Sequence, residues 1–405
     1  MKNALLAFFQ RIEPAFKKGG KLEKFYPAYE AFYTFVFRPV IPTSSPPHIR
    51  DGVDLKRTMT AVIISLIPCT LFGIWNIGHQ HYISIGQHTG ISEAFFAKFL
   101  YGLKVFLPIL IVSYVTGLAV EFTFSVVRGH PVSEGFLVTG LLIPLVMPPT
   151  IPLWTVAVAT IAGIIFGKEV FGGTGYNVVN PALFVRAIIF FGYPAYITGN
   201  VWVETGGLKT VDGFTGATPL AILKQAESSN VQLLDPWTLF IGTIPGSIGE
   251  TSKLMCLIGA ILLIIWQVAD LSIILSALAG TAVFGIIANY LGSSPITQIP
   301  FYYHYLIGGY AFGITFMATD PVSAAKTPTG KIIYGAAIGI LIPLLRIVNP
   351  AYPEVTMLVI LFCNGLSSLI DVSILAINKR RRMKRWQTAK KPEPLLSIEQ
   401  MHKVE

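Results

Sequence analysis

The segment "VTMLVILFCNGLSSLIDVSILAI" (355–377) is followed directly by "NKRRRMKRWQTAKK" (378–391). An apolar run of about 20 residues is long enough to cross a bilayer as an α-helix. Basic residues directly after such a run usually lie on the cytoplasmic side. Eight of the 30 Lys and Arg residues fall within 379–391. Membrane topology therefore accounts for the net charge of +9 better than nucleic-acid binding does.

The rest of the chain has the same apolar character. Of its 405 residues, 53% are hydrophobic and 13% are charged, against about 25% charged in soluble proteins. We predict an all-α integral membrane protein with about ten transmembrane helices, at 58–78, 101–125, 134–147, 152–168, 181–198, 253–268, 270–291, 304–319, 331–347 and 355–377. The third and fifth segments are short, and Pro144 interrupts the third. Segments of this kind are tolerated where protein buries them or where they line a cavity.

The loops predict the orientation of the chain. An even number of spans and a basic tail place both termini in the cytoplasm. The loop 76–94 has no Lys or Arg and is predicted outside, whereas "RGH" (128–130) and "GKE" (167–169) are predicted inside. The first 20 residues lack a long apolar core, so no signal peptide is expected.

This topology divides the chain into five parts. They are a cytoplasmic N-terminal segment (1–57), a first membrane repeat (58–198), an external loop (199–252), a second membrane repeat (253–377) and a basic cytoplasmic tail (378–405). We predict a repeat because "NVVNPAL" (177–183) and "RIVNPAY" (346–352) share V-N-P-A at an offset of 169 residues. Five spans per copy require that the two halves have inverted topology, with functional groups where broken helices meet.

The stretch "VDGFTGATPL" (211–220) is polar and glycine-rich within the external loop. Gly213 and Gly216 permit positive φ or close backbone approach. Thr218 followed by Pro219 is a typical helix start, with Thr at the N-cap and Pro at the first helical position. A turn into a short surface helix explains the pattern without a ligand. The same helix N-terminus also favours a phosphate, which a link to the Thr218 oxygen would hold there.

Three classes of function fit these features. Ten spans, an inverted repeat and broken helices fit a cofactor-free secondary transporter as well as a redox subunit. The threonine motif separates the two, because a cofactor-free transporter has no reason to place it at an external helix start. A structural scaffold protein would leave both the motif and the carboxylates within the spans unexplained. Cys69, Cys256 and Cys363 stand singly in apolar segments and indicate no metal site.

Several motifs together resemble a known family. "DGFTGAT" (212–218) is similar to the Asp-Gly-x-(Ser/Thr)-Gly-Ala-Thr motif at which a flavin transferase attaches FMN. The others are "HIRDGVDLKR" (48–57), "KEVFGGTGYNVVNPAL" (168–183), "PGSIGE" (245–250), "MATDPVSA" (317–324) and "VNPAYPE" (348–354). The set resembles the B subunit family of the sodium-translocating NADH:quinone oxidoreductases of bacterial inner membranes. The D subunit of the related Rnf complex shares the threonine motif, but the chain length and "RDGVDLKR" favour the quinone reductase.

The resemblance implies two flavin sites. Thr218 would carry FMN through a phosphoester on the external face, within a motif that includes Asp212 and Gly216. Non-covalent riboflavin would lie nearer the cytoplasm, at positions that match Asn177, Asn180 and Asp320. Amide and carboxylate groups can hydrogen-bond a flavin ring or its ribityl chain. For each asparagine, capping of a helix at a broken span is the alternative.

The resemblance also implies sites for quinone and sodium. Gly117 matches the first of two adjacent glycines near the quinone site, and Leu118 replaces the second, which puts inhibitor sensitivity in doubt. Glu121 should share a helix face with Gly117, four residues earlier. Glu121 and Asp371 match acidic positions implicated in sodium handling, and carboxylates inside spans are functional candidates. The alternative for both is pairing with an interfacial Lys or Arg.

The implied function is electron transfer within a multi-subunit membrane complex. A peripheral external flavin subunit would reduce the FMN on Thr218, and electrons would pass to riboflavin and then to ubiquinone near the cytoplasm, coupled to sodium export. "GGTGYNVVN" (172–180) lacks the strand–turn–helix context of a dinucleotide fingerprint. NADH oxidation therefore belongs to another subunit.

Overall fold

The computed structural model describes residues 2–17, 19–20, 22–26, 29–30, 33, 37, 55–87, 90–129, 135–199, 201–225, 234–292, 295–348 and 354–389. Most of "HIRDGVDLKR", the residues Asn349 to Ala351 of the second V-N-P-A copy, and the tail beyond Ala389 lie outside the described residues.

Six helices within this part of the chain are long and apolar enough to cross a membrane. They are α3 (Leu55–Ser84), α4 (Phe95–Arg128), α6 (Leu153–Gly167, with the turn that follows it), α11 (Leu271–Leu291), α15 (Pro328–Val348) and α16 (Thr356–Ala389). Three shorter apolar helices are α5 (Gly135–Leu145), α7 (Pro181–Gly192) and α10 (Lys253–Ile265). The described ranges contain no β-strand, which agrees with the predicted all-α class. The number of ten crossings stays a prediction.

The predicted span 304–319 is not one continuous helix. It begins with α13 (Tyr303–Leu306), which a bend at Gly308 with φ +65° separates from α14 (Tyr310–Phe312). A π-helical turn (Gly313–Met317) follows α14 directly. Arg346 of α15 donates to the carbonyl oxygens of His304 (2.9 Å) and Ile307 (3.0 Å). These bonds satisfy carbonyls at the break, as a non-helical backbone at membrane depth requires.

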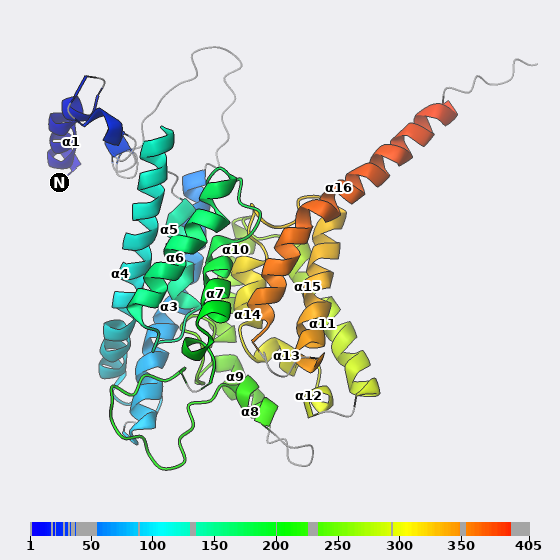
Figure 1. Cartoon of the computed structure of the whole chain (residues 1–405). Helices are drawn as coiled ribbons and strands as arrows, with labels where there is room; N and C mark the ends of the chain where they lie inside the picture. The colour runs from blue at the N-terminus through cyan, green and yellow to red at the C-terminus, as the bar shows by residue number, and fades with distance from the viewer. Residues whose placement is uncertain are drawn as a thin grey trace, which may run out of the picture.

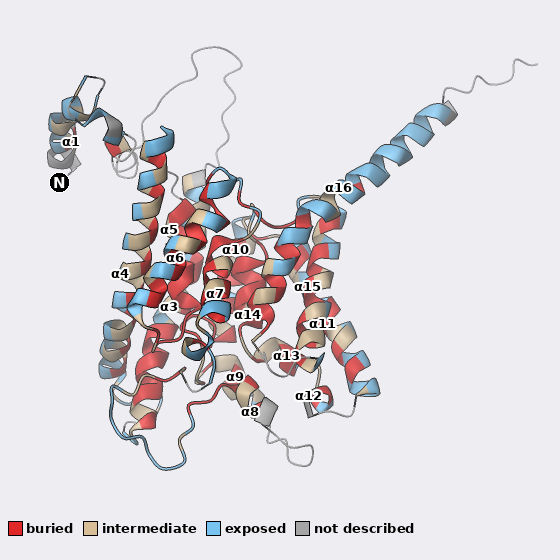
Figure 2. Cartoon of the chain, viewed as in Figure 1, coloured by how far each residue is buried: buried red, intermediate tan, exposed pale blue. Residues whose placement is uncertain are grey.

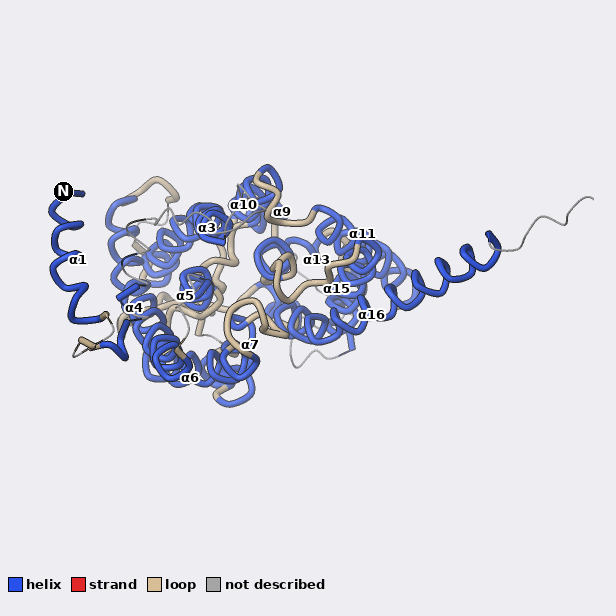
Figure 3. The backbone as a smooth tube through the Cα atoms, turned by 90° about the horizontal axis from the view of Figure 1, so that it is seen from above, coloured by secondary structure: helices blue, strands red, loops and turns tan. Residues whose placement is uncertain are grey.

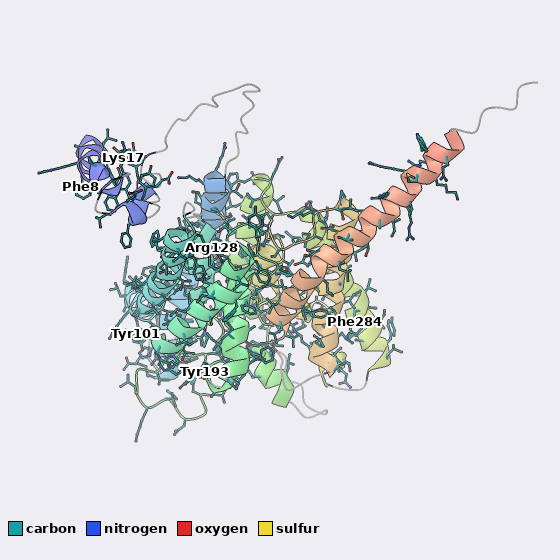
Figure 4. All side chains as sticks on the ribbon, turned by 45° about the horizontal axis from the view of Figure 1, so that its top comes forward. Phe8, Lys17, Tyr101, Arg128, Tyr193 and Phe284 are labelled. Carbon is teal, nitrogen blue, oxygen red and sulfur yellow. The ribbon has the colours of Figure 1, made fainter. Side chains whose placement is uncertain are left out.

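Both ends of the described chain lie on one side of the helical body (Figure 1). α1 (Lys2–Phe16) and the end of α16 mark this side, which we call the terminal side. The short helices α8 (Pro219–Gln225), α9 (Pro236–Ile241) and α12 (Pro295–Gln298) lie on the opposite side. In Figure 4, Arg128 at the end of α4 lies towards the terminal side, and Tyr193 after α7 lies away from it.

Burial follows the arrangement of long and short helices. The centre of the body is buried, and the outer faces of α4 and α16 are exposed (Figure 2). On α4 the exposed side chains are large and apolar, including Leu107, Ile111 and Val115. A helix that is apolar on all faces is typical of a membrane span. The apolar parts of these outer faces are therefore suited to contact with lipid.

The helices of the two halves pack in a similar pattern. In the first half α6 packs against α4 and α7, and in the second half α15 packs against α11 and α16. Figure 3 shows α3 to α7 grouped on one side of the body and α11, α15 and α16 on the other. Asn180 and Pro181 of the first V-N-P-A copy start α7. The inverted two-fold relation stays a prediction.

Candidate functional site

A cavity with apolar walls and a few polar side chains, which we call the main cavity, lies among the helix ends on the terminal side. It is lined by residues from 58–62, 135–142, 168–181, 263–268 and 316–322. The cavity and its mouth contain about 720 Å³ of space between protein atoms.

The main cavity brings together Asn177, Asn180 and Asp320, three residues that the sequence singled out. The Asn180 Oδ1 accepts hydrogen bonds from the N–H groups of Ala182 (3.0 Å) and Leu183 (3.4 Å) and so caps α7. The expected capping role is confirmed. Since the oxygen makes the cap, the side-chain NH₂ is the group that Asn180 offers to a ligand.

Asp320 is held from its own segment. Its Oδ2 accepts from the Ser323 hydroxyl (2.7 Å), and its Oδ1 accepts from the Val322 N–H (3.2 Å). Burial raises the pKa of the Asp320 carboxyl, although these hydrogen bonds act in the opposite direction. A half-buried carboxyl with fixed oxygens is a strong acceptor for a ligand N–H or O–H group.

Thr174 is a wall residue that sequence reasoning missed. Its hydroxyl is buried and finds no hydrogen-bond partner in the described parts of the chain. Leaving a buried hydroxyl unpaired costs about 1–3 kcal/mol. A polar ligand in the main cavity would remove that cost. The signal in the sequence was its position within the motif 168–183, three residues before Asn177.

Glu121 forms a buried ion pair with Lys168, a residue that also lines the main cavity. Pairing was the alternative stated for Glu121, and here it is observed. Gly117 and Glu121 both lie on the buried face of α4, as their spacing predicted. A Cβ at Gly117 would lie 1.9 Å from Cζ of Phe136, so a glycine here permits the close packing of α4 against α5.

Asp371 of α16 binds the start of α15. Its carboxylate accepts from the N–H groups of Lys326 (2.7 Å) and Thr327 (3.0 Å) and from the Thr327 hydroxyl (2.6 Å). Carboxylates are favourable at the N-terminus of a helix. The carboxylate thus has partners from another segment, and it remains half-buried at the terminal side.

Thr218 lies on the side opposite the main cavity. Its hydroxyl accepts from the Ala221 N–H (3.2 Å), and Pro219 opens α8, which confirms the predicted helix start. Gly213 and Gly216 have φ of +87° and +57°, as expected for a turn that only glycine adopts easily. Asp212 is exposed, whereas Thr218 is only 5% exposed.

A buried ionic cluster around Arg186 was not foreseen. The Arg186 guanidinium binds Glu250 (2.6 Å), Glu354 (3.1 Å) and the Val146 carbonyl oxygen (2.6 Å). The two glutamates end the motifs "PGSIGE" and "VNPAYPE", and Arg186 lies within the fifth predicted span. Its position in an apolar segment was the signal that could have identified it as a candidate.

The fold and the cavity define a polytopic all-α membrane protein whose site is built from broken helices. The chain matches the NQR2, RnfD, RnfE family over residues 42–378, and it belongs to this family. It is 44% identical over 396 residues to the B subunit of the Na(+)-translocating NADH-quinone reductase of Chromohalobacter salexigens, across 93% of this chain and 95% of that protein. The same subunit of Ectopseudomonas mendocina is 43% identical over 403 residues (94% and 98%), and that of Azotobacter vinelandii 42% over 406 residues (94% and 98%). These matches confirm the family resemblance.

Proposed function

We propose that this chain is the membrane-embedded B subunit of a sodium-translocating NADH:quinone reductase in a bacterial inner membrane. It carries covalent FMN on Thr218 and riboflavin in the main cavity, and it passes electrons to ubiquinone near the cytoplasmic side, coupled to sodium export. The observation that carries the proposal is that Asn177, Asn180 and Asp320 line one cavity on the side opposite Thr218. Relatives that are named as this subunit, and that match over 93–94% of the chain, support it.

The flavins supply the redox chemistry when bound, and the protein supplies their placement and surroundings. In the main cavity the Asn180 NH₂ and the Thr174 hydroxyl can donate hydrogen bonds, and the Asp320 carboxyl can accept them. Lys168 adds a cation that Glu121 balances. This donor set fits a neutral heterocycle with imide and polyol groups better than it fits a metal ion.

The attachment site imposes a condition on FMN loading. The Thr218 oxygen caps α8, where N–H groups favour a phosphate. Because Thr218 is 5% exposed, the transferase must act before residues 211–217 pack, or these residues must open. A peripheral external flavin subunit and the other members of the complex would meet the chain on this side.

Two other functions have less support. An Rnf-type D subunit belongs to the same family, but the three relatives described above are all B subunits of the quinone reductase. A cofactor-free transporter would leave the threonine motif "DGFTGAT" unexplained. A purified chain without flavin absorbance would favour the transporter.

Asn180→Asp should lower the content of releasable flavin. The aspartate retains the oxygen that caps α7, but it replaces the NH₂ donor by a second acceptor. We expect a loss of about tenfold, because an unmade hydrogen bond to a buried group costs about 1–3 kcal/mol. The measurement is the flavin released when the purified chain is denatured, with the flavin retained on the polypeptide as the internal reference.

Asp235→Asn is the matched control for this change. Asp235 caps α9 on the opposite side, with its Oδ2 accepting from the Thr238 N–H (3.0 Å). We expect normal content of both flavins in this variant. A normal content of releasable flavin in the Asn180→Asp variant would show that riboflavin does not bind in the main cavity.

Gly117, Glu121 and Asp371 are proposed to act in quinone and sodium handling. We expect Asp371→Asn to raise the sodium concentration needed for half-maximal quinone reduction about fivefold. A carboxylate about 4 Å from a cation in water contributes about 1 kcal/mol, and the asparagine retains an oxygen for Thr327. Steady-state quinone reduction against sodium concentration measures the effect.

Thr327→Ala separates charge from structure. It deletes the hydroxyl that donates to Asp371 at 2.6 Å and keeps the negative charge. We expect an unchanged sodium dependence in this variant. A shift of the same size in both variants, or in neither, would make Asp371 a structural cap of α15.

A further inference from the structure

The helix α16 is longer than a membrane span requires. It runs from Thr356 to Ala389 over 34 residues, which is about 51 Å at 1.5 Å per residue. Its apolar part, 356–377, already covers about 33 Å, and the hydrocarbon core of a bilayer is about 30 Å thick. The remaining residues, 378–389, which we call the basic extension, therefore lie beyond the hydrocarbon core. Figure 1 shows the end of α16 projecting beyond the helical body on the terminal side.

The basic extension carries a dense cluster of positive charge. Six of the seven residues 379–385 are Lys or Arg, and no Asp or Glu occurs between Asp371 and Glu393. Every residue from 378 to 387 is exposed. Arg385 lies about 12 Å beyond Ile377 along the helix axis, the headgroup layer is about 5–7 Å thick, and the Debye length is about 8 Å. All six cations are therefore within electrostatic reach of the headgroups.

The extension is helical although its charges repel each other. Arg380 and Lys384 are four residues apart, as are Arg381 and Arg385, and like charges at this spacing destabilise a helix. Cations are favourable in the last turn of a helix, but the last turn of α16 contains no basic residue. The helix dipole therefore does not offset the repulsion. A negatively charged partner would offset it.

An apolar face of the basic extension continues a face of the span. Met383 and Trp386 follow Val372 and Leu375 at helical spacing. The exposed fractions are 63% for Val372, 57% for Leu375, 50% for Met383 and 56% for Trp386. Trp residues are enriched at the level of the headgroups. A bilayer surface offers this helix both negative charge and apolar contact, whereas water offers no apolar contact.

We propose that the basic extension binds anionic phospholipid headgroups of the leaflet on the terminal side. This inference goes beyond the proposed function and does not depend on either flavin. The Lys and Arg side chains pair with phosphate oxygens of the lipids, and Met383 and Trp386 lie at the boundary between headgroups and acyl chains. Orientation of the chain requires cations near the end of a span, but it does not require that they continue the helix. Lipid phosphates supply that reason, because they neutralise the repulsion within the extension.

Hydrogen exchange of the backbone amides of 378–389 tests the proposal. The full-length protein is placed in bilayer discs of phosphatidylcholine alone, or of an equal mixture with phosphatidylglycerol. We expect exchange to be at least about tenfold slower in the anionic discs, because each Lys or Arg near an anionic surface strengthens binding about fivefold. Added salt should speed exchange in the anionic discs, where it screens attraction, and slow it in the neutral discs, where it screens repulsion.

Removal of the charge should remove the dependence on lipid. Gln forms helices about as well as Arg and Lys, so glutamine substitutions change the charge and preserve the helix. Exchange should then agree within about twofold between the two kinds of disc. The cations Lys379, Lys390 and Lys391 remain and preserve the basic end that orients the chain. The variant is Arg380→Gln/Arg381→Gln/Arg382→Gln/Lys384→Gln/Arg385→Gln.

Two further variants make the result specific to charge at this position. The charge-preserving variant Arg380→Lys/Arg381→Lys/Arg382→Lys should retain the lipid dependence of the unaltered protein. Arg11→Gln/Lys17→Gln removes two exposed cations of α1 on the same side and should also leave that dependence unchanged.

The other outcomes overturn the inference. Exchange in the unaltered protein that does not depend on lipid charge would show that the extension does not bind anionic headgroups. An equal lipid dependence in the glutamine variant would show that the headgroups act elsewhere on the protein. Protection that appears only in the assembled complex, whatever the lipid, would show that an acidic surface of a partner subunit covers the extension.

Discussion

Thr218→Ala is expected to abolish the flavin fluorescence that stays with this polypeptide under denaturing conditions. The phosphoester requires a side-chain oxygen, and alanine has none. The same change removes the cap of α8, in which the Thr218 Oγ1 accepts from the Ala221 N–H at 3.2 Å. That loss costs about 1 kcal/mol, too little to unfold the protein. In-gel fluorescence after electrophoresis measures the retained flavin.

Two further variants make the result specific to this oxygen. Thr215 lies in the same motif and is exposed, so Thr215→Ala should leave the fluorescence unchanged. Thr218→Asn preserves the ability to cap the helix but offers no hydroxyl, and it should also be non-fluorescent. Fluorescence that persists in the Thr218→Ala variant would show that the flavin is attached to another residue. Loss in Thr215→Ala alone would make Thr215 the attached residue.

Arg186→Gln is expected to destabilise the protein more than any of the other substitutions. It would leave Glu250 and Glu354 buried without their cation, because the guanidinium now binds both at 2.6 and 3.1 Å. Removing one partner of a buried ion pair costs about 3–5 kcal/mol. That is a large part of the stability of an ordinary domain. Thermal unfolding of the purified chain in detergent measures the loss.

Lys17→Gln is the control. Lys17 pairs with Glu13 at 3.0 Å on α1, with 61% of its side chain exposed, and an exposed pair contributes about 0.2–1 kcal/mol. Adding Glu250→Gln to Arg186→Gln should recover part of the stability, because contacting residues are not additive. A loss in Arg186→Gln no larger than in Lys17→Gln would show that the cluster does not hold the helix breaks together.

The cluster also explains how the broken helices are joined. Arg186 of α7 binds the Val146 carbonyl oxygen just after α5, Glu250 just before α10 and Glu354 just before α16. One side chain therefore satisfies groups at three interruptions of the helical backbone. Because unpaired polar groups are costly in a bilayer, these interruptions depend on the arginine.

Local chemistry determined what the sequence by itself could predict. The apolar runs gave the all-α class, since each run is a property of consecutive residues. The cap at Thr218 and the positive φ of Gly213 and Gly216 depend on neighbours within a few residues, so they too could be predicted. The family motifs pointed to Asn177, Asn180 and Asp320, although nothing local shows that Asp320 lies beside the two asparagines.

Contacts between distant residues were decided only by the tertiary structure. Lys168 and Glu121 are 47 residues apart, and Arg186 and Glu354 are 168 apart. The break in the predicted span 304–319 depends on Arg346, which supplies donors from another helix. Hydropathy records how apolar a segment is, but it does not record which face meets which neighbour. The partners of the buried charges and the main cavity arise from that choice of neighbours, because packing alone brings the ends of separate helices together.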